Sequence, residues 1–190
     1  MQLWVGLGNP GPEYAMNRHN VGFMASDAIA EVHGFSASRK AFQGWVSEGR
    51  LGDHKLILLK PGTYMNESGR AVGAAMRFYK MEVGDVTVFH DELDLVPFKV
   101  KVKTGGGTAG HNGLRSTEAH IGNAFRRVRI GIGHPGHKDR VSPYVLGNYA
   151  KAEIDPLSDM LGAVAAEAAW LAAGDDARFM NEVALRLVAP

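Results

Sequence analysis

The chain contains no cysteine among its 190 residues, no long apolar run, and no large excess of charge of either sign. The absence of cysteine excludes disulfide bonds, thiolate metal sites and a cysteine nucleophile, and it fits a reducing compartment. The longest apolar stretch, residues 161–173, contains Glu167 and is too short to span a bilayer. The net charge of +1 by itself favours no particular class of partner.

The composition is that of an ordinary globular protein, with 45% apolar and 22% charged residues. Residues 1–6 lead directly into a strand pattern, with neither a basic segment nor a long apolar core, so we expect no signal peptide and no membrane association. We therefore expect a cytoplasmic protein. The length suits one domain with a full core, and neither a repeat nor a linker divides the chain. We predict a single domain over residues 1–190.

Hydrophobic periodicity predicts an α/β fold. The expected strands are residues 3–7, 45–51, 55–59, 86–89, 98–103 and 128–132, and the expected helices are residues 20–33, 68–79, 112–121, 155–173 and 175–187. The expected helix caps are Ser68, Asn112, Asp155 with Pro156 at the first helical position, and Asp175 or Asp176. Because strands alternate with helices, we predict a twisted mixed central sheet with helices on both faces and a helical C-terminus.

Basic residues concentrate in residues 95–140, where nine lysines and arginines accompany only two acidic residues. The nine are Lys99, Lys101, Lys103, Arg115, Arg126, Arg127, Arg129, Lys138 and Arg140. A local basic patch on a nearly neutral protein suits a phosphate-bearing partner. A solvated strand face is the other interpretation of the same charges.

Two glycine-rich loops invite a comparison with nucleotide-binding motifs. Residues 6–11 match G-x-G-x-x-G, but a proline on each side of Gly11 opposes the helix that a dinucleotide site needs there. We interpret this loop as a rigid turn that directs Asn9 out of the end of the sheet. Residues 104–113 lack the ending of a P-loop, yet their glycines allow the backbone to approach a ligand closely. The lysines of residues 98–103 favour a phosphate-rich ligand over a merely flexible connection.

Two short polar segments follow predicted strands and contain groups that can activate water. Residues 8–20 contain Asn9 and end in the run Arg18-His19-Asn20, and residues 90–94 have the sequence HDELD. A histidine, a carboxylate that orients it and side-chain amides are the parts of a hydrolytic site. These segments therefore predict a hydrolase.

A metal hydrolase is an alternative interpretation, in which His90, Asp91 and His111 would bind the ion. The sequence contains no H-E-x-x-H motif and no cysteine that would complete such a site. It also lacks the G-x-S-x-G motif of a serine nucleophile. The motifs thus favour a site without a metal or another cofactor, and the metal hydrolase stays open as the less favoured alternative.

Five blocks of the sequence together resemble the bacterial peptidyl-tRNA hydrolases. They are residues 8–22 (GNPGPEYAMNRHNVG), 60–69 (KPGTYMNESG), 90–95 (HDELDL), 105–114 (GGGTAGHNGL) and 129–147, which contains RIGIGHPG and YVLG. Their order and spacing hold over nearly the whole chain, which makes the match far more specific than any single motif. Asn17 and Thr108 differ from the commonest form of the family, but neither position is expected to do chemistry.

The resemblance implies that the chain cleaves the ester between a peptide and the 3′ ribose of tRNA, and that it acts as a monomer. It implies that His19 is the general base and that Asp91 fixes its tautomer and stabilises the imidazolium. It also implies that Asn9 distinguishes blocked from free aminoacyl groups.

The same resemblance implies two sets of binding residues. Those for the peptide and the tRNA 3′ end are Tyr14, Tyr64, Met65, Asn66 and Asn112. Those that clamp the tRNA 5′-phosphate are Lys101, Lys103 and Arg129, which would position the tRNA without reading its bases. Two alternatives remain open at this point: an esterase for small acylated molecules with an incidental basic face, and a tRNA-binding protein without catalytic activity.

Overall fold

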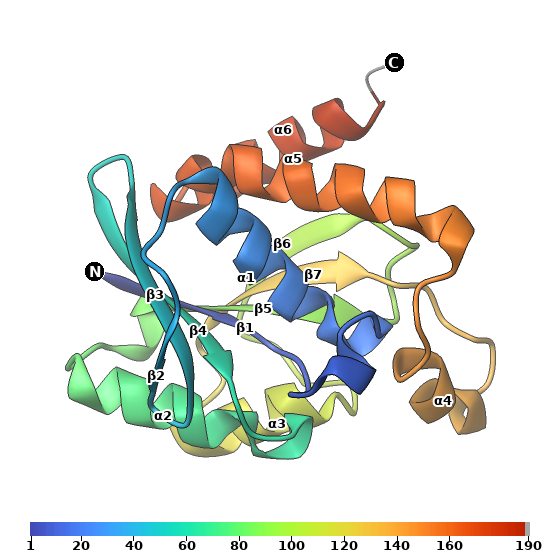
Figure 1. Ribbon diagram of the computed structural model, residues 1–190, viewed down its shortest axis with the longest axis horizontal. Helices are drawn as coiled ribbons and strands as arrows, with labels where there is room; N and C mark the ends of the chain where they lie inside the picture. The colour runs from blue at the N-terminus through green and yellow to red at the C-terminus, as the bar shows by residue number, and fades with distance from the viewer. Residues whose placement is uncertain (189–190) are drawn as a thin grey trace.

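A seven-stranded mixed sheet runs through the computed structural model, which describes residues 1–188 (Figure 1). Its strands are β1 (Gln2–Gly6), β2 (Arg39–Ala41), β3 (Gly44–Leu51), β4 (His54–Pro61), β5 (Val86–Glu92), β6 (Val100–Thr104) and β7 (Arg126–Gly131). They lie in the order β2-β3-β4-β1-β5-β7-β6. The pairs β1–β4, β1–β5 and β5–β7 are parallel, whereas β2–β3, β3–β4 and β6–β7 are antiparallel. The predicted mixed sheet is therefore confirmed.

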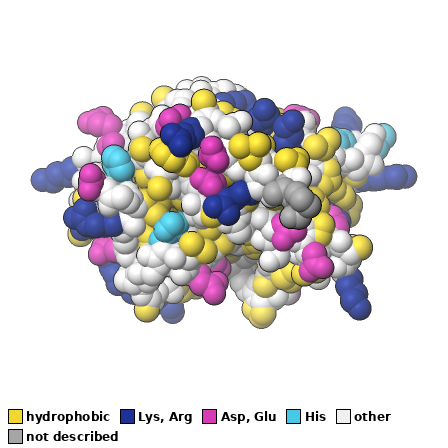
Figure 2. Space-filling view, turned by 90° about the horizontal axis from the view of Figure 1, so that it is seen from above, with side chains coloured by type: hydrophobic (Ala, Val, Ile, Leu, Met, Phe, Trp, Pro, Cys, Tyr) yellow, Lys and Arg dark blue, Asp and Glu magenta, His cyan; other side chains and the backbone are white. Residues whose placement is uncertain are grey.

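Helices cover both faces of this sheet. They are α1 (Val21–Val32), α2 (Ser68–Phe78), α3 (Asn112–Ile121), α4 (Val141–Val145), α5 (Ile154–Ala172) and α6 (Asp176–Val188). Figure 1 shows α1, α5 and α6 on one face and α2 and α3 on the other. No helix within residues 1–188 has the length and apolar character needed to cross a membrane. Seen from the side of α5 and α6, basic and acidic side chains alternate on the surface without a patch of one sign (Figure 2).

The central strand β1 shows how the two layers are built. Trp4 faces the core under α1 and α5, whereas Leu3 and Val5 face the core under α2, and all three are fully buried. Alternate side chains of a strand point to opposite faces, so a strand covered on both sides needs an unbroken apolar run. The run Leu3–Val5 meets this requirement, which is why it was recognisable as a strand.

The structure adds two elements that the sequence did not predict. β2 pairs with β3 through a two-residue turn in which Phe42 and Gln43 have φ values of 53° and 58°. Such turns usually contain glycine or asparagine, and Phe-Gln gives no signal of this kind. The other addition, α4, has only five residues and therefore shows too little periodicity to be recognised.

The predicted cap of α6 is confirmed, because Asp175 Oδ1 accepts from the backbone N–H of Arg178 at 3.1 Å. The three other predicted helix caps are wrong by one or two positions. Ser68 is the first residue of α2, and His111 rather than Asn112 caps α3. α5 begins at Ile154 because the preceding 3-10 turn continues directly into it, so Asp155 and Pro156 lie inside its first turn. Both residues remain suited to that turn, since a carboxylate favours the positive end of the helix dipole and proline needs no donor there.

Candidate active site

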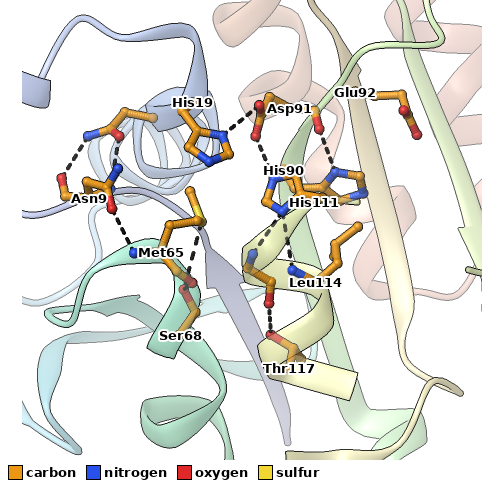
Figure 3. A network of polar contacts seen from close by, with 12 residues as sticks. Asn9, His19, Met65, Ser68, His90, Asp91, Glu92, His111, Leu114 and Thr117 are labelled. Carbon is orange, nitrogen blue, oxygen red and sulfur yellow. Dashed lines mark hydrogen bonds and ion pairs between the residues drawn. The ribbon is translucent and has the colours of Figure 1, made fainter. Parts of the chain in front are cut away.

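Asp91, near the end of β5, accepts hydrogen bonds from two histidines (Figure 3). The distance from His19 Nδ1 to Asp91 Oδ2 is 2.8 Å, and that from His111 Nε2 to Asp91 Oδ1 is 2.7 Å. His19 lies in a 3-10 turn (Arg18–Asn20) that precedes α1, and His111 follows the glycine-rich loop. Three segments far apart in the sequence therefore meet at one buried carboxylate.

The hydrogen bonds determine which nitrogen of each histidine carries the proton. His111 Nδ1 accepts from the backbone N–H groups of Gly113 and Leu114, at 3.1 and 3.2 Å, so its proton lies on Nε2 and is donated to Asp91. His19 donates from Nδ1 to the carboxylate, which leaves its Nε2 unprotonated. The free lone pair of His19 Nε2 is therefore available to accept a proton.

The carboxylate controls the protonation of His19. Burial alone would lower the pKa of His19, but the negative charge of Asp91 and the hydrogen bond to it outweigh burial and raise that pKa. Burial likewise would raise the pKa of Asp91, yet the charges and hydrogen bonds of His19 and His111 hold it well below its usual range. Asp91 is therefore ionised at neutral pH and stabilises a proton on His19.

Asn9 is held rigidly at the end of β1. Asn20 Oδ1 accepts from the backbone N–H of Asn9, and Asn20 Nδ2 donates to the backbone oxygen of Asn9, both at 2.9 Å. Asn9 Oδ1 accepts from the backbone N–H of Met65 at 2.7 Å. This bond fixes the orientation of the side-chain amide, whose Nδ2 has no partner within residues 1–188 and can donate to a ligand.

A cavity of about 870 Å³ opens over this network. Nine of the eleven predicted site residues line it, namely Asn9, His19, Tyr64, Met65, Asn66, Asp91, Lys103, Asn112 and Arg129. Tyr14 and Lys101 do not line it. The ring of Tyr14 packs edge-on against Tyr64 with the centroids 6.3 Å apart, and Lys101 lies directly opposite Arg129 in the β6–β7 pair. Both therefore lie beside residues of the cavity wall.

Among the nine basic residues of residues 95–140, the three arginines of β7 have partners inside the protein. Arg126 forms an ion pair with Asp176 at 2.9 Å, and Arg129 Nε donates to Glu92 Oε1 at 2.9 Å. Lys101 and Lys103 are exposed and lie on the same face of the sheet as Arg129. The six other basic residues, Lys99, Lys101, Lys103, Arg115, Lys138 and Arg140, are exposed, and of these Lys103 and Lys138 line the cavity.

Arg127 stabilises the glycine-rich loop. Its side chain is 1% exposed, and its guanidinium donates to the backbone oxygens of Gly106, Gly107 and Asn123 at 2.6 to 3.2 Å. Gly106 has a φ of 103°, a conformation that other residues rarely adopt, although a Cβ there would meet only the flexible end of Lys103. The loop therefore needs glycine for its backbone conformation, and a buried arginine holds it in place.

His90 differs from the other two histidines. Its Nδ1 donates to the backbone oxygen of Asp91 at 2.8 Å, and its Nε2 has no partner within residues 1–188. Burial and the neighbouring His111 lower the pKa of His90 to about 3, so it is neutral. The residues that could hold a metal are His19, Asp91 and His111, whose ligand atoms lie within 4.8 Å of one another. Of the three metal ligands considered from the sequence, Asp91 and His111 belong to this group, but the third member is His19 and not His90.

The sequence did not predict that His111 donates to Asp91, or that Asn20 holds Asn9 in place. His111 was considered only as a metal ligand, although its place directly before a predicted helix was a signal for a cap. Asn20 was recognised in the polar run but not as the residue that holds Asn9. Both roles depend on contacts between segments that only the folded chain brings together.

Comparison with known proteins agrees with this geometry. Residues 3–189 match the family model described as peptidyl-tRNA hydrolase. The peptidyl-tRNA hydrolase of Rhizorhabdus wittichii is 79% identical over 187 residues, which cover 98% of this chain and 99% of that protein. That of Erythrobacter litoralis is 73% identical over 189 residues and the full length of both. The crystal structure of peptidyl-tRNA hydrolase from Acinetobacter baumannii superposes with a TM-score of 0.90 and 41% identity, covering 96% of this chain and 94% of that one. The chain belongs to the peptidyl-tRNA hydrolase family.

Proposed function

We propose that this chain hydrolyses the ester that joins a peptide to the 3′ ribose of tRNA, and so releases free tRNA and peptide from prematurely dissociated or stalled peptidyl-tRNA. The observation that carries the proposal is the hydrogen bond between His19 Nδ1 and Asp91 in the wall of a cavity, which leaves Nε2 of the neutral imidazole as the proton acceptor. Family membership supports the same activity and substrate. We further propose that the protein acts in the cytoplasm as a single-domain monomer without a metal or cofactor.

The proposed reaction begins when His19 Nε2 accepts a proton from a water molecule that attacks the ester carbonyl. A bond forms from the water oxygen to the carbonyl carbon, and the negative charge of Asp91 stabilises the resulting imidazolium. The bond from that carbon to the ribose oxygen then breaks, and the imidazolium returns its proton to this oxygen. His111, through its own hydrogen bond to Asp91, keeps the carboxylate in the orientation that serves His19.

The role of Asn9 follows from the orientation of its amide. The bond from Met65 fixes the amide of Asn9 and leaves its Nδ2 donor without a partner within residues 1–188, so that Nδ2 can donate to the substrate. A blocked aminoacyl group offers an amide carbonyl as acceptor, whereas a free α-ammonium group is itself a donor and has no acceptor to offer. We propose that Asn9 selects blocked substrates in this way. The exposed amides of Asn66 and Asn112 would bind the peptide and the tRNA 3′ end.

The binding of tRNA is assigned to the rim of the cavity. Tyr64 is 60% exposed and Tyr14 supports it edge-on, which suits stacking of an unpaired adenine, while Met65 supplies an apolar wall. Lys101 and Lys103 would bind the 5′-phosphate as exposed point charges. Arg129 would contribute less to phosphate binding than the lysines as long as its guanidinium donates to Glu92.

The test is single-turnover release of the acyl group from N-acetyl-aminoacyl-tRNA, beside unblocked aminoacyl-tRNA, each with and without EDTA. Rapid cleavage of the blocked ester alone, unchanged by EDTA, is the expected result. Cleavage of small acyl esters but not of the tRNA ester would support the esterase, and tRNA binding without turnover would support the binding protein. Loss of activity in EDTA would support a metal at His19, Asp91 and His111.

A further inference from the structure

The turn that contains His19 is joined to a distant segment, residues 144–153, by hydrogen bonds of both backbone and side chains. The backbone N–H of Arg18 donates to the oxygen of Gly147 at 3.0 Å. Asn17 pairs with Asn148 as an isolated antiparallel bridge, and Asn17 Nδ2 donates to Asn148 Oδ1 at 2.8 Å. The position of the turn therefore depends on where residues 144–153 lie.

The side chain of Arg18 makes the most extensive of these contacts. Its Nη2 donates to Glu153 Oε1 at 3.0 Å, and its Nη1 donates to the backbone oxygens of Asn148 and Tyr144 at 3.1 and 3.5 Å. The guanidinium also lies 4.4 Å from the centre of the Tyr144 ring. The side chains of Arg18 and Glu153 are only 14% and 25% exposed. Glu153 Oε1 would keep the backbone N–H of Ala150, and the Tyr144 oxygen would keep that of Gly147. Removal of the guanidinium would nevertheless take away the charged partner of a partly buried carboxylate, which costs more than the loss of a surface ion pair.

The same segment overlaps one wall of the cavity. Val141, Val145 and Leu146, from α4 and the residue after it, line the cavity. A five-residue helix is too short to be stable without tertiary contacts, and Figure 1 shows α4 apart from the two helix layers. Its contacts with the rest of the protein include the hydroxyl of Tyr144, which donates to the oxygen of Ile132, and the guanidinium of Arg18. Arg18 therefore belongs to the turn of the proposed base and also contacts α4, which forms this wall of the cavity.

We infer that Arg18 is a positioning residue that joins His19 and the α4 wall into one unit, so that the wall places the acyl group relative to the base. The inference rests on the proposed function, in which His19 is the general base. An error of about 1 Å in the relative position of reacting groups can cost about a hundredfold in rate. Loss of Arg18 therefore slows catalysis itself, in addition to any loss of stability.

The pKa of His19 reports whether this unit is intact. Asp91 from β5 and His111 before α3 face the ring of His19, and Arg18 lies beside it on the same turn. Tyr149 lies close enough to Asp91 for the carboxylate charge to help raise the pKa of its hydroxyl. Burial lowers the pKa of His19, and Asp91 raises it. A turn that moves away from Asp91 while His19 stays buried will therefore lower the pKa of His19.

The test compares Arg18→Met with Arg186→Met, a control whose arginine pairs with a glutamate and does not line the cavity. Arg186 Nε contacts Glu167 Oε1 at 2.6 Å and joins α6 to α5, and the side chain of Glu167 is only 11% exposed. For Arg18→Met we expect kcat on N-acetyl-aminoacyl-tRNA to fall by about tenfold or more, and the pKa of His19 measured by NMR titration to decrease. For Arg186→Met we expect thermal stability to fall, while kcat stays within about twofold of wild type and the pKa of His19 stays unchanged.

Glu153→Gln is the second variant if Arg18→Met fails to fold. It keeps the shape of the side chain and an acceptor oxygen but removes the charge, so we expect changes in kcat and in the pKa of His19 that are smaller and of the same direction. A folded variant with wild-type kcat and wild-type pKa of His19 would overturn the inference and leave Arg18 with a structural role alone. Wild-type protein without turnover would defeat the proposed function only, because the NMR titration needs no substrate.

Discussion

The charged side chains at the end of β5 and on the surface of β6 differ in their burial and in their partners. Both carboxylate oxygens of Asp91 are buried and accept a hydrogen bond from a histidine, whereas Lys101 and Lys103 are exposed and have no ion-pair partner within residues 1–188. The first arrangement fixes a geometry, since a buried charge is stable only while its partners stay in place. The second provides attraction with little geometric demand.

This contrast separates the two tasks that we propose for the site. Chemistry needs a base whose tautomer and orientation are determined, and the buried network determines both. Binding of a tRNA needs positive charge that tolerates small differences in approach, and exposed lysines provide it. Arg129 lies between the two regions, because it faces the lysines but already donates to Glu92. Variants at the two regions should therefore change different kinetic constants.

The largest effect is expected for His19→Ala, which removes the proposed base. We expect kcat to fall by about a thousandfold, within the range that general acid–base catalysis contributes, with little change in the affinity for tRNA. Single-turnover rates and tRNA binding measure the two quantities. His54→Ala is the control, because His54 is exposed at the start of β4 and does not line the cavity. A His19→Ala rate near that of wild type would exclude His19 as the base.

The second effect concerns Asp91→Asn, which keeps the shape of the side chain but removes the charge. One amide oxygen cannot accept from both histidines as the carboxylate does, so we expect kcat to fall by about a hundredfold. The pH dependence of activity should also shift in a defined direction. Only neutral His19 is a base, and Asp91 raises its pKa, so wild-type activity declines on the acid side at a higher pH than an ordinary histidine would give. In Asp91→Asn this acid limb should shift to lower pH, and an acid limb that stays in place would contradict the proposed control by Asp91.

The same contrast explains which parts of the site were predictable. His19, Asp91 and Asn9 lie in short polar segments that end or follow strands, and their residue types alone indicate a hydrolase. The shared use of Asp91 by His19 and His111 needs the register of the folded chain, because the two histidines lie in segments that no local pattern relates. The pairing of Arg129 with Glu92 is hidden for the same reason, since it joins side chains of two neighbouring parallel strands.

The fold shows a similar division. The apolar run of β1 and the Gly52-Asp53 turn between β3 and β4 are local signals, and the structure confirms both. β2 was missed because its turn uses Phe42 and Gln43 in a conformation that most residues avoid, and contacts of the Phe42 ring with Phe78 and Tyr79 accompany it. Local patterns therefore predict elements whose residues suit the conformation by themselves, and they miss those that depend on contacts elsewhere.

The smallest effect is expected for the double variant Lys101→Ala and Lys103→Ala, which changes only the exposed region. We expect KM for N-acetyl-aminoacyl-tRNA to rise by about tenfold and its dependence on salt to weaken by about two counterions, because each lysine that contacts a phosphate releases one on binding. kcat should stay nearly constant, since neither lysine contacts Asp91 or His19. Lys55→Ala, at an exposed position on β4, is the matched control for loss of charge. A fall in kcat with unchanged KM would show that the lysines act on the chemistry after all, and the separation of the two regions would then be wrong.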